Sequence, residues 1–244
     1  MATNTNATLE QMKELKLHGM ALSYEQFIRM PINQQPTSHE MIAQLLEKEA
    51  FERTHRRTQM YLRLSKLRYA ASLEQVICSE ERNLSKDTIA KLADCSFVSY
   101  AQNILITGAT GCGKSYLACA LGHQACLMGF KTLYLNMNRF IEKISLAKLE
   151  GTYLKLLNRI EKIPLLILDD FGLQPLQTHT KLALLQILED RYSKKATIIS
   201  SQLPIDKWYD YIDDATFADA ILDRLTTAAH RIELKGKSLR KKEI

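Results

Sequence analysis

The chain has 244 residues and a net charge of +6, with 25% charged and 46% hydrophobic residues, which is ordinary for a soluble globular protein. No apolar run approaches the ~20 residues that a membrane-spanning helix needs, and the N-terminus lacks the features of a signal peptide. We therefore expect a cytoplasmic protein and no membrane, and the positive charge permits a polyanionic partner. The five cysteines show no metal-ligand spacing. Their odd number, without a secretion signal, indicates reduced thiols.

The N-terminal region reads as helical. Residues 1–8 are small and polar, and we expect them to be frayed. Apolar positions recur at helical spacing over 9–30, and the prolines of 31–36 interrupt the pattern. Thr37 and Ser38, followed by Glu40, offer a helix N-cap, so we expect one long helix over 38–70.

This long helix carries a basic stretch. Between Lys48 and Arg68 there are seven Lys or Arg residues against two Glu. A basic stripe can follow DNA phosphates, but it can equally be a solvated face with local salt bridges, and the charges alone do not decide. The candidate DNA contacts are Arg53, Arg56, Arg57, Lys66 and Arg68.

We expect two domains: a helical one at 1–72, which binds DNA or a partner, and a second at 73–244. The second domain begins with short helices over 73–77 and 85–93, where Ser85 is a possible cap. We expect segment 76–102 to help hold a nucleotide base.

The sequence GATGCGKS at 108–115 follows the apolar run 103–107 and precedes a helical segment, 116–128. This strand, loop and helix carry the complete G-x-x-x-x-G-K-[ST] spacing of a phosphate-binding loop. Glycines bring backbone N–H groups against phosphate oxygens, Lys114 reaches the β- and γ-phosphates, and the Ser115 hydroxyl coordinates Mg²⁺. The protein is therefore expected to bind ATP through Gly108, Ala109, Thr110, Gly111, Cys112, Gly113, Lys114, Ser115 and Tyr116.

The remainder of the chain alternates strands with helices. Strands are expected at 131–136, 165–168, 196–201 and 231–234, and helices at 138–162, 178–193 and 217–228, with Gly129 as a C-cap. This alternation predicts an α/β fold with a parallel sheet covered by helices on both faces. One additional strand, 131–136, separates the phosphate loop from the run LLILDD in the sequence, which suits hydrolytic motors better than simple kinases.

Polar residues gather where these strands end. Asp169 can hold Mg²⁺, and Asp170 can accept a proton from the attacking water. Ser201 and its neighbours lie where a γ-phosphate sensor would be. Arg224 lies near the end of the last expected helix, and Arg240 lies beyond the last expected strand. Either could act on phosphate or form a surface ion pair, with Asp223 or Glu233 as the candidate partner.

Several stretches of the chain are distinctive: GATGCGKS, LLILDDFG, TIISSQLPIDKWYDYI, DAILDRL and GKSLR, with LKLHGMALSYEQF and EKEAFERTHRR in the N-terminal region. Together they resemble the IstB family, the ATP-binding helper proteins of bacterial insertion sequences. These are relatives of the DnaC helicase loaders in the AAA+ class. The resemblance covers nearly the whole chain.

The resemblance implies an AAA+ fold in which 108–115 is Walker A and Asp169 with Asp170 is Walker B. It further implies that Ser201 is the first sensor, Arg224 is the finger on the next subunit's ATP, and Arg240 is the second sensor. Asp170 replaces the usual glutamate, so slow hydrolysis is expected, and Ser201 replaces the common asparagine.

The leading hypothesis is an ATP-dependent transposition helper that assembles on double-stranded DNA and acts with a transposase. A helicase loader is the alternative within the family, although no aromatic-rich basic groove for single strands is evident. From other classes, a small-molecule phosphotransferase would use the same loop and Mg²⁺ without a partner subunit, and an ATP-gated scaffold would hardly hydrolyse ATP.

Overall fold

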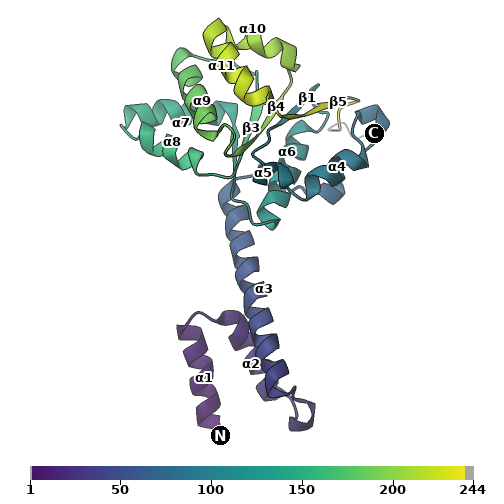
Figure 1. Cartoon of the computed structure of the whole chain (residues 1–244), viewed down its shortest axis with the longest axis vertical. Helices are drawn as coiled ribbons and strands as arrows, with labels where there is room; N and C mark the ends of the chain where they lie inside the picture. The colour runs from purple at the N-terminus through teal and green to yellow at the C-terminus, as the bar shows by residue number, and fades with distance from the viewer. Residues whose placement is uncertain (1, 240–244) are drawn as a thin grey trace. The chain divides into compact units, whose positions relative to one another are not determined.

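The computed structural model describes residues 2–239 (Figure 1). The chain divides into two compact units, Met1–Met60 and Tyr61–Ile244, and the division falls inside one long helix. None of the helices within the described residues is long and apolar enough to cross a membrane.

The first unit is entirely helical. It contains α1 (Ala2–Glu14), α2 (His18–Arg29), a 3-10 turn at Ile32–Gln34 and the start of α3 (Ser38–Ser65). The expectation of a frayed start is wrong, and the helical spacing over 9–30 is shared by two helices. Helix α1 already begins at Ala2, and it stops because Lys16 adopts a left-handed conformation, with φ of 59°. The amide of Leu17 then donates to the Met12 carbonyl at 2.8 Å, which closes the helix end.

A carboxylate on α3 caps the start of α2. Glu49 Oε2 accepts hydrogen bonds from the amides of Gly19, at 2.8 Å, and Met20, at 3.2 Å. A Cβ on Gly19 would lie 2.5 Å from the Lys48 carbonyl oxygen, so only glycine allows this approach. The predicted cap of α3 is confirmed. The Thr37 amide donates to Glu40 Oε2 at 2.9 Å.

The second unit opens with short helical pieces. These are the 3-10 turns Leu73–Gln75 and Glu80–Arg82, followed by α4 (Lys86–Ala93) and α5 (Ser96–Ser99). Ser85 caps α4 as predicted, since its Oγ accepts from the Thr88 amide at 3.0 Å.

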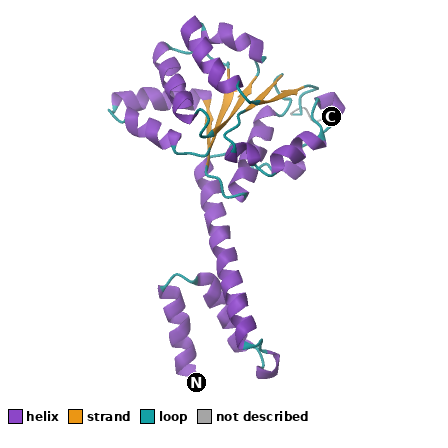
Figure 2. Ribbon diagram, viewed as in Figure 1, coloured by secondary structure: helices purple, strands orange, loops and turns teal. Residues whose placement is uncertain are grey.

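A five-stranded parallel sheet forms the centre of this unit (Figure 2). Its strands are β1 (Ile104–Gly108), β2 (Thr132–Asn136), β3 (Leu165–Phe171), β4 (Ala196–Ser201) and β5 (His230–Leu234), in the spatial order β2-β3-β4-β1-β5. The strand that separates the phosphate loop from the aspartates in space is therefore β4, whereas β2, which separates them in the sequence, lies at the edge.

Helices cover both faces of the sheet, which confirms the predicted fold class. Ile104 and Ile106 of β1 pack with α4, α5 and α6 (Lys114–Leu127). Leu105 packs on the opposite face, within the core formed by α7 (Met137–Leu149), α8 (Tyr153–Glu161), α9 (Thr178–Arg191), α10 (Trp208–Ile212) and α11 (Ala215–Thr226). The single helix expected over 138–162 is two helices, because Gly151 takes a positive φ of 67° between them.

Candidate nucleotide-binding site

The glycine loop connects β1 to α6 with the geometry that its spacing predicts. Gly108, Gly111 and Gly113 all have positive φ. A Cβ on Gly108 would lie 2.1 Å from the Leu234 carbonyl oxygen, and one on Gly113 would lie 2.8 Å from Nη2 of Arg82. These neighbours leave room only for glycine, so the loop backbone is held tightly at the start of α6.

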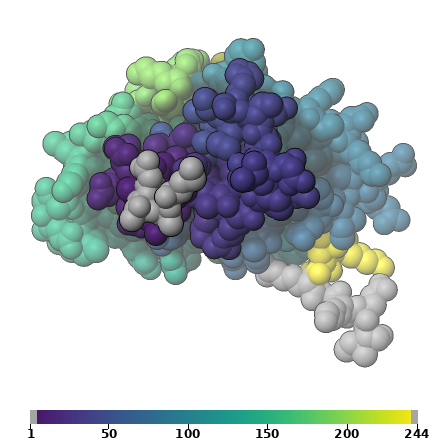
Figure 3. Space-filling view, turned by 90° about the horizontal axis from the view of Figure 1, so that it is seen from below, coloured from purple at the N-terminus to yellow at the C-terminus, as the bar shows by residue number. Residues whose placement is uncertain are grey.

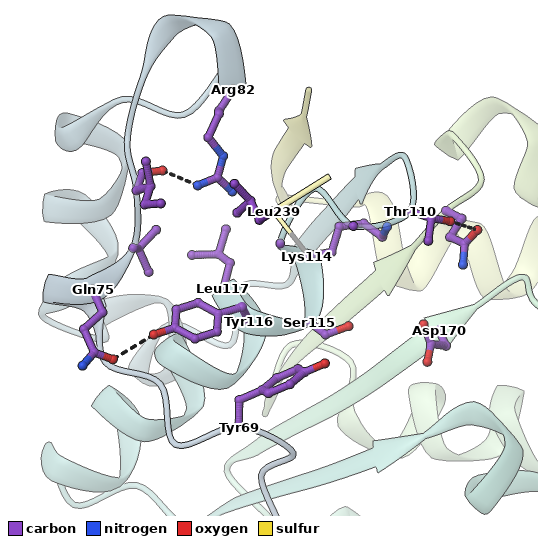
Figure 4. A pocket seen from close by; sticks show the side chains of 15 residues that line it. Tyr69, Gln75, Arg82, Thr110, Lys114, Ser115, Tyr116, Leu117, Asp170 and Leu239 are labelled. Atoms are coloured by element: carbon purple, nitrogen blue, oxygen red, sulfur yellow. Dashed lines mark hydrogen bonds between the residues drawn. The ribbon is translucent and has the colours of Figure 1, made fainter. Parts of the chain in front are cut away.

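A pocket of about 340 Å³ opens beside the loop (Figure 4). Thr110, Gly111, Gly113, Lys114, Ser115 and Tyr116 line it, whereas Gly108, Ala109 and Cys112 are not among its lining residues. Tyr69, Val76 and Ile77 supply apolar surface, as expected for a base-binding segment that includes residues 76 and 77. The pocket thus joins a phosphate-binding loop to a surface suited to a planar base.

Lys114 lies within the turn of the loop. Its Nζ donates to the carbonyl oxygens of Gly108, at 2.8 Å, and Ala109, at 2.9 Å. The side chain is buried, so its positive charge is fixed at the loop rather than held out in solvent. A fixed cation beside backbone N–H groups and a helix N-terminus favours a bound polyphosphate.

Asp169 lies fully buried near the end of β3 and is surrounded by hydroxyl groups. Its Oδ1 accepts from Ser115 Oγ at 3.0 Å and from Ser200 Oγ, and its Oδ2 accepts from the Tyr134 hydroxyl at 2.5 Å. The Ser115 hydroxyl and a carboxylate therefore meet at the phosphate end of the pocket. This donor set fits Mg²⁺, which prefers one or two protein oxygens together with substrate phosphates.

Asp170 projects into the pocket because β3 is irregular at this point. The β3–β4 register shifts between Leu168 and Phe171, and Asp170 takes a left-handed φ of 60°. Its Oδ2 accepts from Asn136 Nδ2 at 2.6 Å. Burial and the charge of Asp169 raise the pKa of Asp170, while Arg68, Asn136 and Lys114 act in the opposite direction. A half-buried carboxylate with a raised pKa is suited to accept a proton.

Arg68, a candidate DNA contact, lies beside this acidic pair. Its Nη1 is 3.5 Å from Asp170 Oδ2 and 4.0 Å from Asp169 Oδ2. Its guanidinium carbon lies 5.3 Å from the centre of the Tyr69 ring. The contact between Arg68 and the end of β3 could not be predicted from spacing in the sequence. The Arg68 side chain remains 43% exposed.

Ser201, the predicted sensor, is buried and bonded to backbone. Its Oγ donates to the Phe171 carbonyl at 2.6 Å and accepts from the Leu203 amide at 3.0 Å. The neighbouring Ser200 contacts Asp169, and Gln202 lines the pocket, where its Oε1 accepts from Thr110 Oγ1 at 2.7 Å. The end of β4 and the residue after it therefore reach the site through two side chains, Ser200 and Gln202, whereas Ser201 holds the backbone.

Of the two predicted arginines, only Arg224 lies among the described residues, and it is not at the pocket of its own chain. Arg224 near the end of α11 forms an ion pair with Glu189 of α9, and its Nη1 lies 3.5 Å from Asp223 Oδ2. It is absent from the lining of the nucleotide pocket. Arg240 lies outside the described residues.

The basic residues of α3 are partly neutralised along the helix itself. Arg53 pairs with Glu49 at 2.7 Å and Arg56 with Glu52 at 2.8 Å, whereas no ion pair of Arg57 occurs within residues 2–239. Local salt bridges of this kind were the alternative to a DNA-binding surface on this helix. Both arginines remain more than half exposed, so the pairs do not remove them from the surface.

Sequence reasoning missed several residues of the site. Tyr134 and Asn136 contact the two aspartates from the neighbouring strand β2. The signal was available in part, because polar residues at the carboxyl ends of parallel strands meet at one edge of the sheet. No pattern in the sequence indicated that Arg82, which lies outside the strands, belongs to the site. Its guanidinium donates to the Cys112 carbonyl at 2.7 Å and fixes the loop from outside the sheet.

Comparisons with known proteins agree with this geometry. The sequence model of the family described as "IstB-like ATP binding protein" matches residues 10–244. The chain is 41% identical to a putative insertion sequence ATP-binding protein of Sinorhizobium fredii, over 97% of this chain and 96% of that one. It is 37% identical to the putative ATP-binding protein of insertion sequence IS1162 from Pseudomonas fluorescens, over 82% and 87%.

Solved structures show the same fold. AMPPCP-bound DnaA from Aquifex aeolicus superposes with a TM-score of 0.60 and 23% identity, over 72% of this chain and 53% of that one. The DnaC helicase loader gives a TM-score of 0.56 at 20% identity, over 68% and 98%. The second unit thus has the AAA+ fold of these proteins.

Proposed function

Because the chain belongs to the IstB-like family of insertion sequence ATP-binding proteins, we propose that it is an ATP-dependent DNA-binding helper of transposition. In this proposal it works in the cytoplasm, assembles on duplex DNA, remodels it and recruits or stimulates a transposase. The proposal rests on a phosphate loop that shares one pocket with Asp170 and contacts Asp169 through Ser115, in a chain similar throughout to insertion sequence proteins.

ATP binding and hydrolysis would use residues that already lie together. Lys114 and the loop amides would bind the β- and γ-phosphates, and Ser115 and Asp169 would hold Mg²⁺, which neutralises charge on the phosphates. Asp170 would accept the proton of the attacking water. Its side chain is one methylene shorter than glutamate, so we propose that hydrolysis is slow and depends on assembly or DNA.

Self-assembly would complete the site. Arg224 lies away from its own pocket and is partly exposed, which suits a residue that reaches the ATP of a neighbouring subunit. We assign Ser201 and Arg240 as the first and second sensors by resemblance. Arg224 would have to leave Glu189 on assembly, and an exposed ion pair of this kind is worth only ~0–1 kcal/mol.

DNA would be bound through its backbone. The helical region 1–72 carries the proposed contacts Arg53, Arg56, Arg57, Lys66 and Arg68, and the chain has a net charge of +6. Contacts of this kind hold duplex DNA without reading its sequence. We keep 1–72 and 73–244 as the functional domains, with DNA or partner binding in the first and ATP hydrolysis in the second.

Two other functions use the same pocket. The likeness to the DnaC helicase loader keeps helicase loading as the alternative, but at 20% identity it concerns the fold alone. A small-molecule phosphotransferase would need neither a second subunit nor DNA. The identity of 41% to an insertion sequence protein over nearly the full length of both chains favours transposition.

Sedimentation of the protein on long duplex DNA of arbitrary sequence tests the proposal. We expect a large assembly with ATP and its loss with ADP. The variant Lys114→Ala, which should not retain ATP, is expected to stay small under both conditions. A wild-type protein that stays small on duplex DNA with ATP would refute the proposal. ATP turnover that depended on a small acceptor would then identify a phosphotransferase.

A further inference from the structure

A second cavity, of about 690 Å³, lies along the edge strand β2. Four consecutive residues of β2, from Leu133 to Asn136, line it, together with residues of α7, α8 and the segment that follows α3. Helices α7 and α8 form part of the surface that Figure 3 shows in green. Because β2 pairs with a strand on one side only, its free backbone groups face this cavity.

The lining of this cavity is strongly basic. Five of its side chains are cationic and one is acidic: Lys66, Arg68, Arg139, Lys143 and Arg159 against Asp170. Within residues 2–239, Arg68 is the only one of the five cations that has a carboxylate partner within 4 Å. Four cations without such a partner around one cavity form a site for a polyanion.

Asp170 lies between the nucleotide pocket and the basic cavity. It lines the nucleotide pocket and also the basic cavity, and Arg68 contacts it from the basic side. The Arg68 guanidinium can therefore pair either with the carboxylates of Asp169 and Asp170 or with an anion that enters the basic cavity. A phosphate among the other four cations would draw Arg68 by its charge and by two parallel hydrogen bonds.

We propose that the basic cavity binds a phosphate of the DNA backbone and that this phosphate draws Arg68 away from Asp170. Asp170 then loses its contact with the guanidinium and keeps only the hydrogen bond from Asn136, so it can orient the attacking water and DNA binding switches on ATP hydrolysis. This inference rests on the proposed function and adds to it a site and a mechanism of regulation. Arg68 acts as a positioning residue, because it works through Asp170 and not on ATP itself.

The chemistry of the cavity favours a phosphodiester backbone over an acidic polypeptide. Two of the cations are lysines and three are arginines, and they come from three separate elements along a strand edge. Cations on three separate elements can contact successive phosphates of one nucleic-acid backbone. Polyglutamate provides the competing probe. Stimulation of ATP turnover by polyglutamate equal to that by DNA would overturn the assignment.

The first test removes cations that do not contact the aspartates. Lys143→Ala and Arg159→Ala should each weaken binding to duplex DNA and lower the slope of log affinity against log salt by about 1. DNA stimulation of ATP turnover should fall in parallel. Lys155→Ala is the matched control, because Lys155 is an exposed cation of α8 outside the cavity. An unchanged salt slope in both cavity variants would overturn the DNA site.

The second test removes the contact with the carboxylates. Arg68→Gln should raise ATP turnover without DNA towards the DNA-stimulated rate of the wild type, and DNA should add little further. Arg68→Lys keeps the charge and should retain part of the stimulation. A fall in basal turnover in Arg68→Gln, with DNA stimulation retained, would overturn the switch. If the wild type assembles on DNA but these variants behave as the wild type does, the inference alone is refuted. If the wild type fails to bind DNA, the proposed function is refuted as well.

Discussion

The hydroxyl of Ser115, at the start of α6, lies 3.0 Å from Oδ1 of Asp169, near the end of β3. This pair joins the phosphate loop to the acidic strand end, and its two oxygens would hold the Mg²⁺ that neutralises charge on the phosphates.

The Ser115 and Asp169 pair predicts that tight nucleotide binding requires Mg²⁺. Chelation of Mg²⁺ should weaken ATP binding in the wild type and abolish turnover, because Lys114 and the loop amides alone leave the phosphates only partly neutralised. Ser115→Ala should lose most of the Mg²⁺-dependent gain in affinity, measured by isothermal titration. Ser115→Thr keeps the hydroxyl and is the control. Equal Mg²⁺ dependence in Ser115→Ala and Ser115→Thr would remove this residue from the metal site.

The hydrogen bond from Asn136 predicts a shift in the pH dependence of turnover. The pKa of Asp170 is raised by burial and by Asp169, and the Asn136 amide lowers it. Because a proton acceptor must be ionised, turnover should fall as the pH drops through this pKa. Asn136→Ala should therefore move the acid limb of the pH–rate profile to higher pH. Asn158→Ala, which changes an exposed amide on α8, should leave the profile unchanged. A shift to lower pH in Asn136→Ala would contradict the assignment of Asp170 as the base.

A buried arginine predicts a large loss of stability on substitution. Arg191 is almost fully buried, and its guanidinium donates to the carbonyl oxygens of Ile160, at 3.0 Å, and Ile163, at 2.7 Å, and to that of Ala196 at 2.5 Å. Burial lowers the pKa of Arg191 to about 9, so it stays charged at neutral pH. Arg191→Leu leaves these carbonyls without a donor and should lower the free energy of unfolding by about 3 kcal/mol.

The measurement for Arg191 is urea unfolding of the full chain followed by the fluorescence of Trp208, the one tryptophan of the sequence, which is buried. Lys194→Leu is the control, because it removes a nearby exposed cation. A loss below about 1 kcal/mol in Arg191→Leu would show that water replaces the guanidinium at these carbonyls.

The Glu49 cap predicts an acid-labile contact within the first unit. Burial alone would raise the pKa of Glu49, but the hydrogen bonds from Arg53, Met20 and Gly19 outweigh it, so this pKa lies below its ordinary value. The stabilisation is therefore present above the ordinary glutamate pKa and is lost as the pH falls through the lowered one. Glu49→Ala at neutral pH should remove about 2 kcal/mol of local stability.

Hydrogen exchange at the Gly19 and Met20 amides measures this loss directly, and about 2 kcal/mol corresponds to roughly 30-fold faster exchange. Glu47→Ala, which removes an exposed carboxylate from the same helix, should leave the exchange of both amides as in the wild type. If the Gly19 and Met20 amides exchange no faster in Glu49→Ala, contacts other than the Glu49 cap stabilise the start of α2.

Much of this site follows from local sequence. The spacing of GATGCGKS predicted the loop, and the apolar run before Asp169 predicted a buried strand, because both signals lie within a few consecutive residues. The alternation of strands and helices predicted a parallel sheet covered on both faces. The ends of several helices were predicted for the same reason, since caps such as Ser85 act over three residues.

The missed features depend on contacts between distant parts of the chain. Arg68 meets Asp170 only because the segment after α3 runs past β2 and β3, and Arg82 meets Gly113 only once the loop and the 3-10 turn are packed. The spatial order of the strands is likewise decided by packing, and it places β4 between the two motifs. No pattern within one stretch of sequence contains this information.

We propose that Arg224 of one chain completes the ATP pocket of another. The most direct test is ATP turnover by a mixture of two variants, Asp170→Asn, which should bind ATP but lacks the proposed base, and Arg224→Ala, which lacks the finger. Each variant alone should be inactive, whether or not DNA is present. Random assembly of equal amounts pairs an intact pocket with an intact finger at about a quarter of the interfaces, so the mixture should recover up to that share of wild-type turnover. A mixture no more active than the sum of its two components, although both variants assemble on duplex DNA, would contradict the claim.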